Sequence, residues 1–173
     1  AYLETMRAAP YMAPAAPKPP TTVLAALGPA MLRLAAEMTD GAHPYCVTPE
    51  HTAEARRILG PGKLLAPEQM VLLETDPAEA RRIARAALAP YVAMVNYANN
   101  WRRLGFTDAD LAGGGSDRFI DANIAWGDEA AIRRRIGQHW DAGADHVTIQ
   151  PLDPKGTRRV DDRVIDLLAP ARA

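Results

Sequence analysis

Residues 24–62 read LAALGPAMLRLAAEMTDGAHPYCVTPEHTAEARRILGPG, and one pattern occurs in them twice. An apolar run with strand character leads to a small residue and a proline, and a segment with helical spacing of its apolar residues follows. The first occurrence predicts a strand over 21–27 and a helix over 30–38. The second predicts a strand over 42–47 and a helix that Thr48 caps. Strands that alternate with helices in this way are typical of parallel βαβ units, so the stretch predicts an α/β fold.

The alternation continues toward the C-terminus. QMVLL at 69–73 predicts a third strand, which is followed by a long helix, and ADHVTIQPL at 144–152 predicts a fourth strand. Residues of about 96–127 predict a helical insertion before the last strand, and residues 153–173 predict a C-terminal helix. Four such βα units make half of a (β/α)8 barrel or a small doubly wound sheet.

The N-terminal residues 1–20 predict the end of a helix and a Pro-rich connection. Residues 1–9 have helical character without an N-cap, and prolines recur through residues 10–20, where they remove backbone donors and restrict the preceding residues. We therefore expect an extended connection before the first strand. The uncapped start also predicts that further chain precedes Ala1.

Composition narrows the class of protein. The chain has 173 residues, 48% of them hydrophobic, and a formal net charge of −1, so we expect one domain with a sizeable core and no general binding to nucleic acid. No apolar run approaches the roughly 18 to 20 residues of a membrane span, so we expect no membrane partner. A single cysteine, Cys46, excludes a disulfide framework and favours a reducing, cytoplasmic location.

Two segments, 24–88 and 127–152, resemble the C-terminal half of the luciferase-like monooxygenase superfamily, and within it the oxidoreductases that use the deazaflavin coenzyme F-420. The resemblance covers about Pro19 to Leu152. It depends on four pieces in a fixed order: Gly28-Pro29 after a strand, Asp40-Gly41 before the next one, Thr48-Pro49-Glu50-His51, and Ala142-Gly143-Ala144-Asp145-His146-Val147. The resemblance implies a TIM barrel in which residues 21–152 form the half barrel of strands five to eight. The first four strands of that barrel would lie outside this sequence.

The resemblance also implies a function. Such an enzyme transfers hydride between a small organic substrate and a bound cofactor, here coenzyme F-420 with FMN as the alternative. We keep a second hypothesis of another class, a non-catalytic half barrel that acts as a dimerising or partner-binding subunit, because open sheet edges favour association. A homodimer or the missing N-terminal half is then the expected partner. A small flavodoxin-like binding domain is a third hypothesis.

Candidate cofactor contacts follow from the strand ends, where a (β/α)8 barrel forms its active site. They are Leu27, Gly28, Pro29, His43, Tyr45 and Gln150. A turn with Gly28 lets the backbone approach a phosphate, and the following helix offers free N–H groups. In the resembled family this turn contacts the phosphate-bearing tail of the cofactor. The sequence singles out no catalytic residue.

The remaining candidates have plainer interpretations. If His43 or Tyr45 points inward, we expect it to hydrogen-bond a cofactor or to donate a proton; the alternative is packing in the core. We expect Gln150 to contact the edge of a cofactor or substrate.

We expect Cys46 in the core, His51 exposed in the first turn of its helix, and the runs Arg102-Arg103 and Arg133-Arg134-Arg135 on solvated helix faces. His139 and His146 lie too far apart for a metal motif, so we expect no metal site. The insertion, with Tyr97, Asn100 and Trp101, has the length to fold over the mouth of a barrel.

Overall fold

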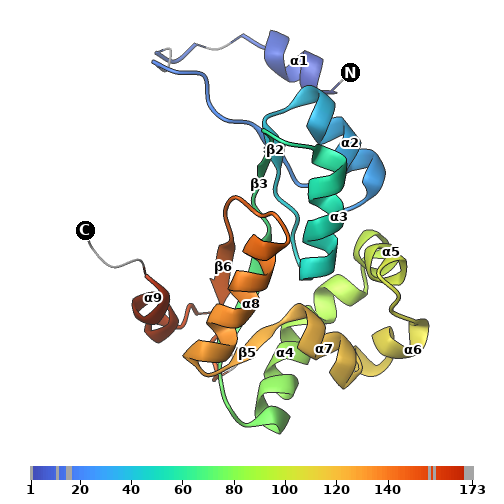
Figure 1. Ribbon diagram of the computed structural model, residues 1–173, viewed down its shortest axis with the longest axis vertical. Helices are drawn as coiled ribbons and strands as arrows, with labels where there is room; N and C mark the ends of the chain where they lie inside the picture. The colour runs from blue at the N-terminus through green and yellow to red at the C-terminus, as the bar shows by residue number, and fades with distance from the viewer. Residues whose placement is uncertain (1, 11, 15–16, 156, 158, 170–173) are drawn as a thin grey trace.

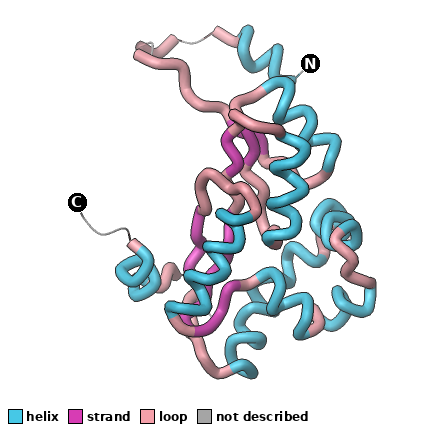
Figure 2. Tube along the Cα trace, viewed as in Figure 1, coloured by secondary structure: helices cyan, strands magenta, loops and turns pink. Residues whose placement is uncertain are grey.

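The computed structural model describes residues 2–10, 12–14, 17–155, 157 and 159–169, and it has the alternating order that the sequence predicts (Figure 1, Figure 2). The helices are α1 (Tyr2–Ala8), α2 (Pro29–Met38), α3 (Pro49–Leu59), α4 (Pro77–Val92), α5 (Val95–Arg103), α6 (Asp108–Leu111), α7 (Asp117–Asn123), α8 (Glu129–Asp141) and α9 (Asp162–Leu168), with a 3-10 turn η1 at Ala112–Gly114. The strands are β1 (Val23–Leu24), β2 (Gly41–Ala42), β3 (Leu64–Leu65), β4 (Glu68–Leu73), β5 (Ala125–Gly127) and β6 (Thr148–Pro151). In the described chain, every helix is too short or too polar to cross a membrane.

The strands pair in parallel and form two small sheets. The stretch of residues 64–73 contributes β3 to one sheet and β4 to the other. The orders are β1-β2-β3 and β5-β4-β6. Backbone hydrogen bonds continue past the break between β3 and β4, because Ala66 N donates to Ala42 O at 3.0 Å and Glu68 N donates to Pro44 O at 2.9 Å. Residues 64–73 therefore link the two sheets. The predicted α/β fold with parallel strands is confirmed.

The Asp40-Gly41 pair joins three strands at their N-terminal ends. Asp40 Oδ2 accepts a hydrogen bond from Thr22 N at 2.7 Å, next to β1. A Cβ atom at position 41 would overlap the carbonyl oxygen of Leu64 in β3. Only glycine fits so close an approach of two backbones. This part of the motif is therefore a requirement of strand pairing.

The strand boundaries differ from the prediction in two regions. The predicted strand 42–47 pairs only as β2, because Pro44 has no N–H and Cys46 has a positive φ of 53°, which a regular strand does not allow. The predicted helical insertion of about 96–127 ends in a strand, since β5 pairs with β4 at Val71. The described residues therefore form six short strands, and the half barrel of four βα units stays a prediction.

Helices cover both faces of β4. Met70 and Leu72 point to one face, where α4, α5 and α7 pack around the buried Trp101. Val71 points to the other, with Ile132 of α8. We call these the α4–α7 face and the α8 face. Parallel crossovers are right-handed, and the steps from β4 to β5 and from β5 to β6 run in opposite directions, so their helices must lie on opposite faces.

The insertion is held by an aromatic core and by helix caps. Phe119 of α7 packs edge-to-face on Trp101 of α5 with ring centroids 4.7 Å apart. Asp76 caps α4 by accepting from Glu79 N at 2.8 Å. On the opposite face of β4, Arg135 of α8 donates to the Asp121 carbonyl at 2.9 Å, so the expectation of a solvated arginine run is wrong at this residue. The guanidinium satisfies a carbonyl at the end of α7.

Candidate functional site

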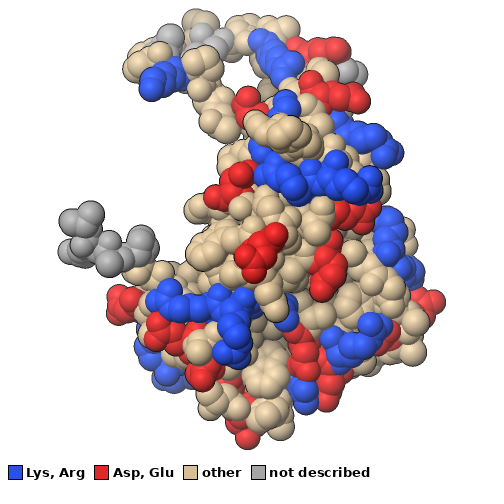
Figure 3. All heavy atoms as spheres, viewed as in Figure 1, with Lys and Arg blue, Asp and Glu red and all other residues tan. Residues whose placement is uncertain are grey.

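Because β1 and β2 pair in parallel, their carboxyl ends lie side by side, and Tyr45 and Cys46 in the loop after β2 pack in the core of the α4–α7 face. The turn after β1 holds Leu27, Gly28 and Pro29, and the loop after β2 comprises residues 43–48. Gln150 of β6 pairs in register with Met70 of β4, in the other sheet. Positive and negative side chains are interspersed over the face of the molecule that Figure 3 shows.

The turn from β1 into α2 exposes the start of a helix. Pro29 is the first helical residue, and Leu32 N is the first amide to bond back, to Gly28 O at 3.0 Å. The amides of Ala30 and Met31 therefore have no helical partner. Gly28 has an ordinary φ of −86°, so its backbone conformation does not demand glycine.

Arg103 of α5 lies over this turn. Its Nη2 atom is 3.4 Å from the place where a Cβ atom of Gly28 would be, so glycine leaves the space beneath the guanidinium open. The guanidinium donates to Asn100 Oδ1 at 3.1 Å, and no carboxylate among the described residues lies within ion-pair distance of it. The positive end of a helix repels a cation, and an anion between them relieves the repulsion. The arrangement therefore suits a phosphate or carboxylate group.

His51 is hydrogen-bonded to the same turn. The side chain is 2% exposed, and Nε2 donates to Leu27 O at 2.8 Å. Because a carbonyl oxygen only accepts, Nε2 carries the hydrogen and Nδ1 is an acceptor. Burial, followed by the nearby Arg103, lowers the pKa of His51. The expectation of an exposed His51 is wrong, because the first turn of α3 packs against the β1–α2 turn.

Tyr45 and Gln150 meet although 105 positions separate them. The Tyr45 hydroxyl donates to Gln150 Oε1, and the Tyr91 hydroxyl of α4 donates to Tyr45 at 3.3 Å. Burial, reinforced by the Tyr91 hydrogen bond, raises the pKa of Tyr45 above its usual range, so the hydroxyl stays protonated. With Oε1 occupied, Gln150 can offer Nε2 as a donor to a ligand.

Glu68 and Cys46 lie beneath this pair. Cys46 N donates to Glu68 Oε2 at 3.0 Å, and the Glu68 side chain is 2% exposed. Burial, followed by the Glu68 charge, raises the pKa of the Cys46 thiol above its usual range. Cys46 is a buried core residue, and an unreactive thiol follows from this environment.

Three buried side-chain atoms in the described part of the chain have no hydrogen-bond partner: His51 Nδ1, Glu68 Oε1 and Asn100 Nδ2. All three belong to residues that touch this region, through Leu27, Cys46 and Arg103. Protein interiors leave few polar atoms unpaired, and each one asks for an explanation. Their grouping at the strand ends marks the region as a candidate ligand site.

His43 is the predicted site residue that stands apart. Its Nδ1 atom is hydrogen-bonded to the carbonyl oxygen of Ala66, which ties the loop after β2 to the link between β3 and β4. Sequence reasoning missed Arg103, His51 and Glu68. The position of Asn100 in an insertion that could reach the barrel mouth was the one signal for the α5 contribution.

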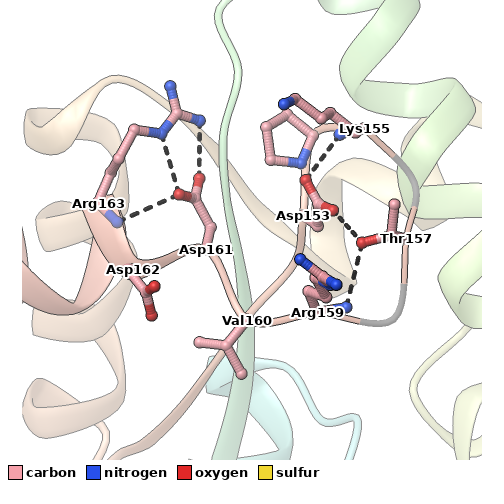
Figure 4. A pocket seen from close by; sticks show the side chains of 9 residues that line it. Asp153, Lys155, Thr157, Arg159, Val160, Asp161, Asp162 and Arg163 are labelled. Atoms are coloured by element: carbon pink, nitrogen blue, oxygen red, sulfur yellow. Dashed lines mark hydrogen bonds and ion pairs between the residues drawn. The ribbon is translucent and has the colours of Figure 1, made fainter.

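A hollow of about 720 Å³ lies elsewhere, in the loop after β6 (Figure 4). Two of its carboxylates are hydrogen-bonded locally: Asp161 accepts from Arg163 Nη2 at 2.8 Å, and Asp153 accepts from the backbone amide of Lys155 at 2.9 Å. These carboxylates are satisfied within the loop. The hollow is therefore a weaker candidate than the turn at Gly28.

Comparisons with known proteins agree on the fold. No protein-family model and no curated protein matches the sequence. The solved structure of the coenzyme F-420 dependent tetrahydromethanopterin reductase from Methanopyrus kandleri matches with a TM-score of 0.56 and 20% identity, over 76% of this chain and 46% of that one. Apo-MsnO8 matches with a TM-score of 0.55 and 18% identity, over 89% and 55%. The chain spans about half the length of these proteins and shares its fold with them, which confirms, at the level of the fold, the resemblance that the sequence predicts.

Proposed function

We propose that this chain forms part of a luciferase-like oxidoreductase that binds coenzyme F-420, with FMN as the alternative, and supports hydride transfer to or from a small organic substrate. The observation that carries the proposal is the Arg103 guanidinium above the open N-terminus of α2 at Gly28. The proposal is supported by the shared fold, since one solved neighbour is described as coenzyme F-420 dependent.

The turn after β1 fits the phosphate of either cofactor. The amides of Ala30 and Met31 and the guanidinium of Arg103 would donate to its oxygens, and Gly28 leaves the space that the group needs. His51 fixes the Leu27 carbonyl and so sets the position of the turn. Pro29 is preorganised for the first helical position.

Tyr45 and Gln150 would hold the cofactor ring. The Tyr45 hydroxyl occupies Gln150 Oε1 and leaves Nε2 to donate to a ring carbonyl oxygen. The cofactor supplies the hydride chemistry when it is bound, and the protein supplies binding and orientation. The role of His43 in cofactor binding stays a prediction, as do the small-molecule substrate and the cytoplasmic location.

A binding titration of the complete gene product tests the proposal. We expect coenzyme F-420 or FMN to bind at micromolar concentration, followed by fluorescence. Arg103→Ala should weaken binding by about tenfold or more, the value of a charge-assisted hydrogen bond. Arg102→Ala is the matched control, because this neighbouring arginine pairs with Asp108 instead. Absence of binding by both cofactors, or equal affinity of the two variants, would contradict the proposal.

The second candidate, a dimerising or partner-binding half barrel, has one observation in its favour. Within the described strands, β1 and β6 each pair on one side only. Next to β6, an apolar hollow of about 480 Å³ is lined by the exposed Trp140 and Ile165. Unpaired strand edges favour association. Solution mass separates the candidates: a dimer that Trp140→Asp dissociates, in a protein that binds neither cofactor, would favour this one.

A further inference from the structure

Glu68 is a buried carboxyl group at the start of β4 with half of its hydrogen-bonding capacity unused. Oε2 accepts from Cys46 N at 3.0 Å, and Oε1 is one of the described atoms without a partner. Burial raises the pKa of Glu68 to about 7, against the opposing effect of the Cys46 amide. The group is therefore largely neutral below pH 7.

The side chains that surround Glu68 are weak acids, and no described residue supplies a countercharge. Tyr45 and Cys46 face it from the loop after β2, and Tyr97 faces it from α5, since the Glu68 charge raises the pKa of each. Tyr91 of α4 adjoins the group through Tyr45, with ring centroids 5.5 Å apart. No described cation acts on the Glu68 pKa. A charge on Glu68 would have only the Cys46 amide and water to stabilise it.

The hydrogen bond to Glu68 comes from Cys46, a residue with an unusual backbone conformation. Cys46 has a φ of 53°, and among the described residues it is the one non-glycine residue in the left-handed region. Such a conformation is unfavourable for a residue with a Cβ atom and persists when neighbouring contacts enforce it. Cys46 follows Tyr45 directly, so the geometry of this turn sets the direction of the Tyr45 side chain toward Gln150.

We propose that Glu68 is a positioning residue of the site: in its neutral form it holds the left-handed turn at Cys46 and thereby keeps Tyr45 against Gln150. In that form Oε2 accepts the Cys46 amide and Oε1 carries the proton. Ionisation places a charge in a dry, uncompensated position, and the loop 43–48 must open to hydrate it. The link to cofactor binding rests on the proposed function, whereas the link to the turn does not.

The sign of the pH effect follows from the raised pKa. The closed loop binds the Glu68 proton more tightly than the open loop, in which the carboxyl has its ordinary value of 4.5. The closed state is therefore fully favoured below about pH 4.5 and loses this advantage as the pH rises through 7. Between pH 5.5 and 8 we expect opening to increase by about thirtyfold.

Cys46 is the sole cysteine of the chain and reports on its own turn. The rate of its reaction with a maleimide, divided by the rate in the urea-unfolded protein at the same pH, measures opening at this residue. We expect this ratio to rise about thirtyfold from pH 5.5 to 8 in the wild type and to stay flat in Glu68→Gln, which is neutral throughout. Glu37→Gln, at an exposed position of α2, is the matched control and should follow the wild type.

Glu68→Ala separates the positioning role from the titration. Loss of the acceptor should expose Cys46 about tenfold more than in the wild type at pH 5.5, without a further rise toward pH 8 and with far-ultraviolet circular dichroism unchanged. Protection equal to the wild type in Glu68→Ala at pH 5.5, or the same pH dependence in the wild type and Glu68→Gln, would overturn the proposal.

A last measurement uses coenzyme F-420 itself. Its affinity should fall from pH 6 to pH 8 in the wild type and not in Glu68→Gln. If no variant binds the cofactor while Cys46 labelling behaves as described, the proposed function fails and the positioning role stands. A fall of the same size in both proteins would contradict the role of Glu68 in cofactor binding.

Discussion

Neighbouring residues of β4 hold two polar clusters of opposite character. Gln69, on the α8 face, belongs to a buried chain that continues through α7 to Trp101 on the α4–α7 face, and every link in it is made: Thr52 to His139 at 2.8 Å, His139 to Gln69 at 3.0 Å, Gln69 to the Asn123 carbonyl at 2.9 Å, and Trp101 to the Asn123 side chain at 2.9 Å. In the candidate ligand site at the strand ends, by contrast, His51, Glu68 and Asn100 each have one buried atom without a partner. A polar cluster that is fully paired stabilises a fold, and one that is not has capacity left for a ligand.

The paired cluster fixes the state of its histidine. Gln69 Nε2 donates to carbonyl oxygens, so Gln69 Oε1 accepts from His139 Nε2 and the Thr52 hydroxyl donates to His139 Nδ1. Burial, followed by the charge of Arg135, lowers the pKa of His139 to about 4. His139 is thus a neutral structural residue at neutral pH.

The largest expected effect comes from breaking the paired cluster. Gln69→Leu leaves the buried His139 N–H without an acceptor and should lower the free energy of unfolding by about 3 kcal/mol, measured by urea denaturation. Gln150→Leu is the matched change on the other face, where the side chain is half-buried, and should cost less than about 1 kcal/mol. Equal losses would remove the distinction between the two clusters.

The two clusters should also respond to pH with opposite sign. His139 has a lowered pKa in the folded state, so the stability it is linked to is present above pH 6.5 and is lost as the pH falls toward 4. Glu68 has a raised pKa, so its contribution is present below pH 4.5 and is lost as the pH rises through 7. Each change amounts to about 2 kcal/mol between pH 5 and 7.5.

Single variants separate these two contributions. Relative to the wild type, Glu68→Gln should lose stability on acidification from pH 7.5 to 5, because the His139 effect is then unopposed. His139→Gln should gain stability over the same range. Denaturation curves at the two pH values provide the measurement, and the same slope in both variants would contradict the opposite signs.

The space at Gly28 offers a test that affects ligand binding alone. Gly28→Val adds a side chain beneath Arg103, where the first added carbon lies 3.4 Å from the guanidinium, while a φ of −86° is ordinary for valine. We expect about tenfold weaker binding of coenzyme F-420 and an unchanged thermal midpoint. A loss of stability without a loss of affinity would assign this glycine a structural role.

Tyr45→Phe should have the smallest effect. The change removes the hydroxyl that orients the Gln150 amide and leaves the ring packing with Tyr91 in place. Cofactor affinity should fall by about threefold to fivefold, close to the net value of one neutral hydrogen bond. Calorimetric titration gives the number, and an effect as large as that of Arg103→Ala would move the centre of the site from the phosphate to the ring.

The comparison also shows how far the sequence could lead. The alternation of strands and helices and the placement of Gly28, Tyr45 and Gln150 at strand ends follow from local patterns, because period and turn residues are local properties. The contact of Arg103 with Gly28 joins residues 75 positions apart through the packing of α5, which no local pattern contains. The paired and unpaired clusters are equally hidden in the sequence, since Glu68 and Gln69 are adjacent polar residues in one apolar strand.

Amide chemical shifts test the central claim most directly. Coenzyme F-420 is titrated into isotopically labelled protein, and the backbone amides of both clusters are followed by nuclear magnetic resonance. The account predicts large shifts at Ala30, Met31 and Cys46, with Thr52 and His139 nearly unchanged. Shifts centred on Thr52 and His139, or none at Ala30 and Met31 at saturating cofactor, would contradict it.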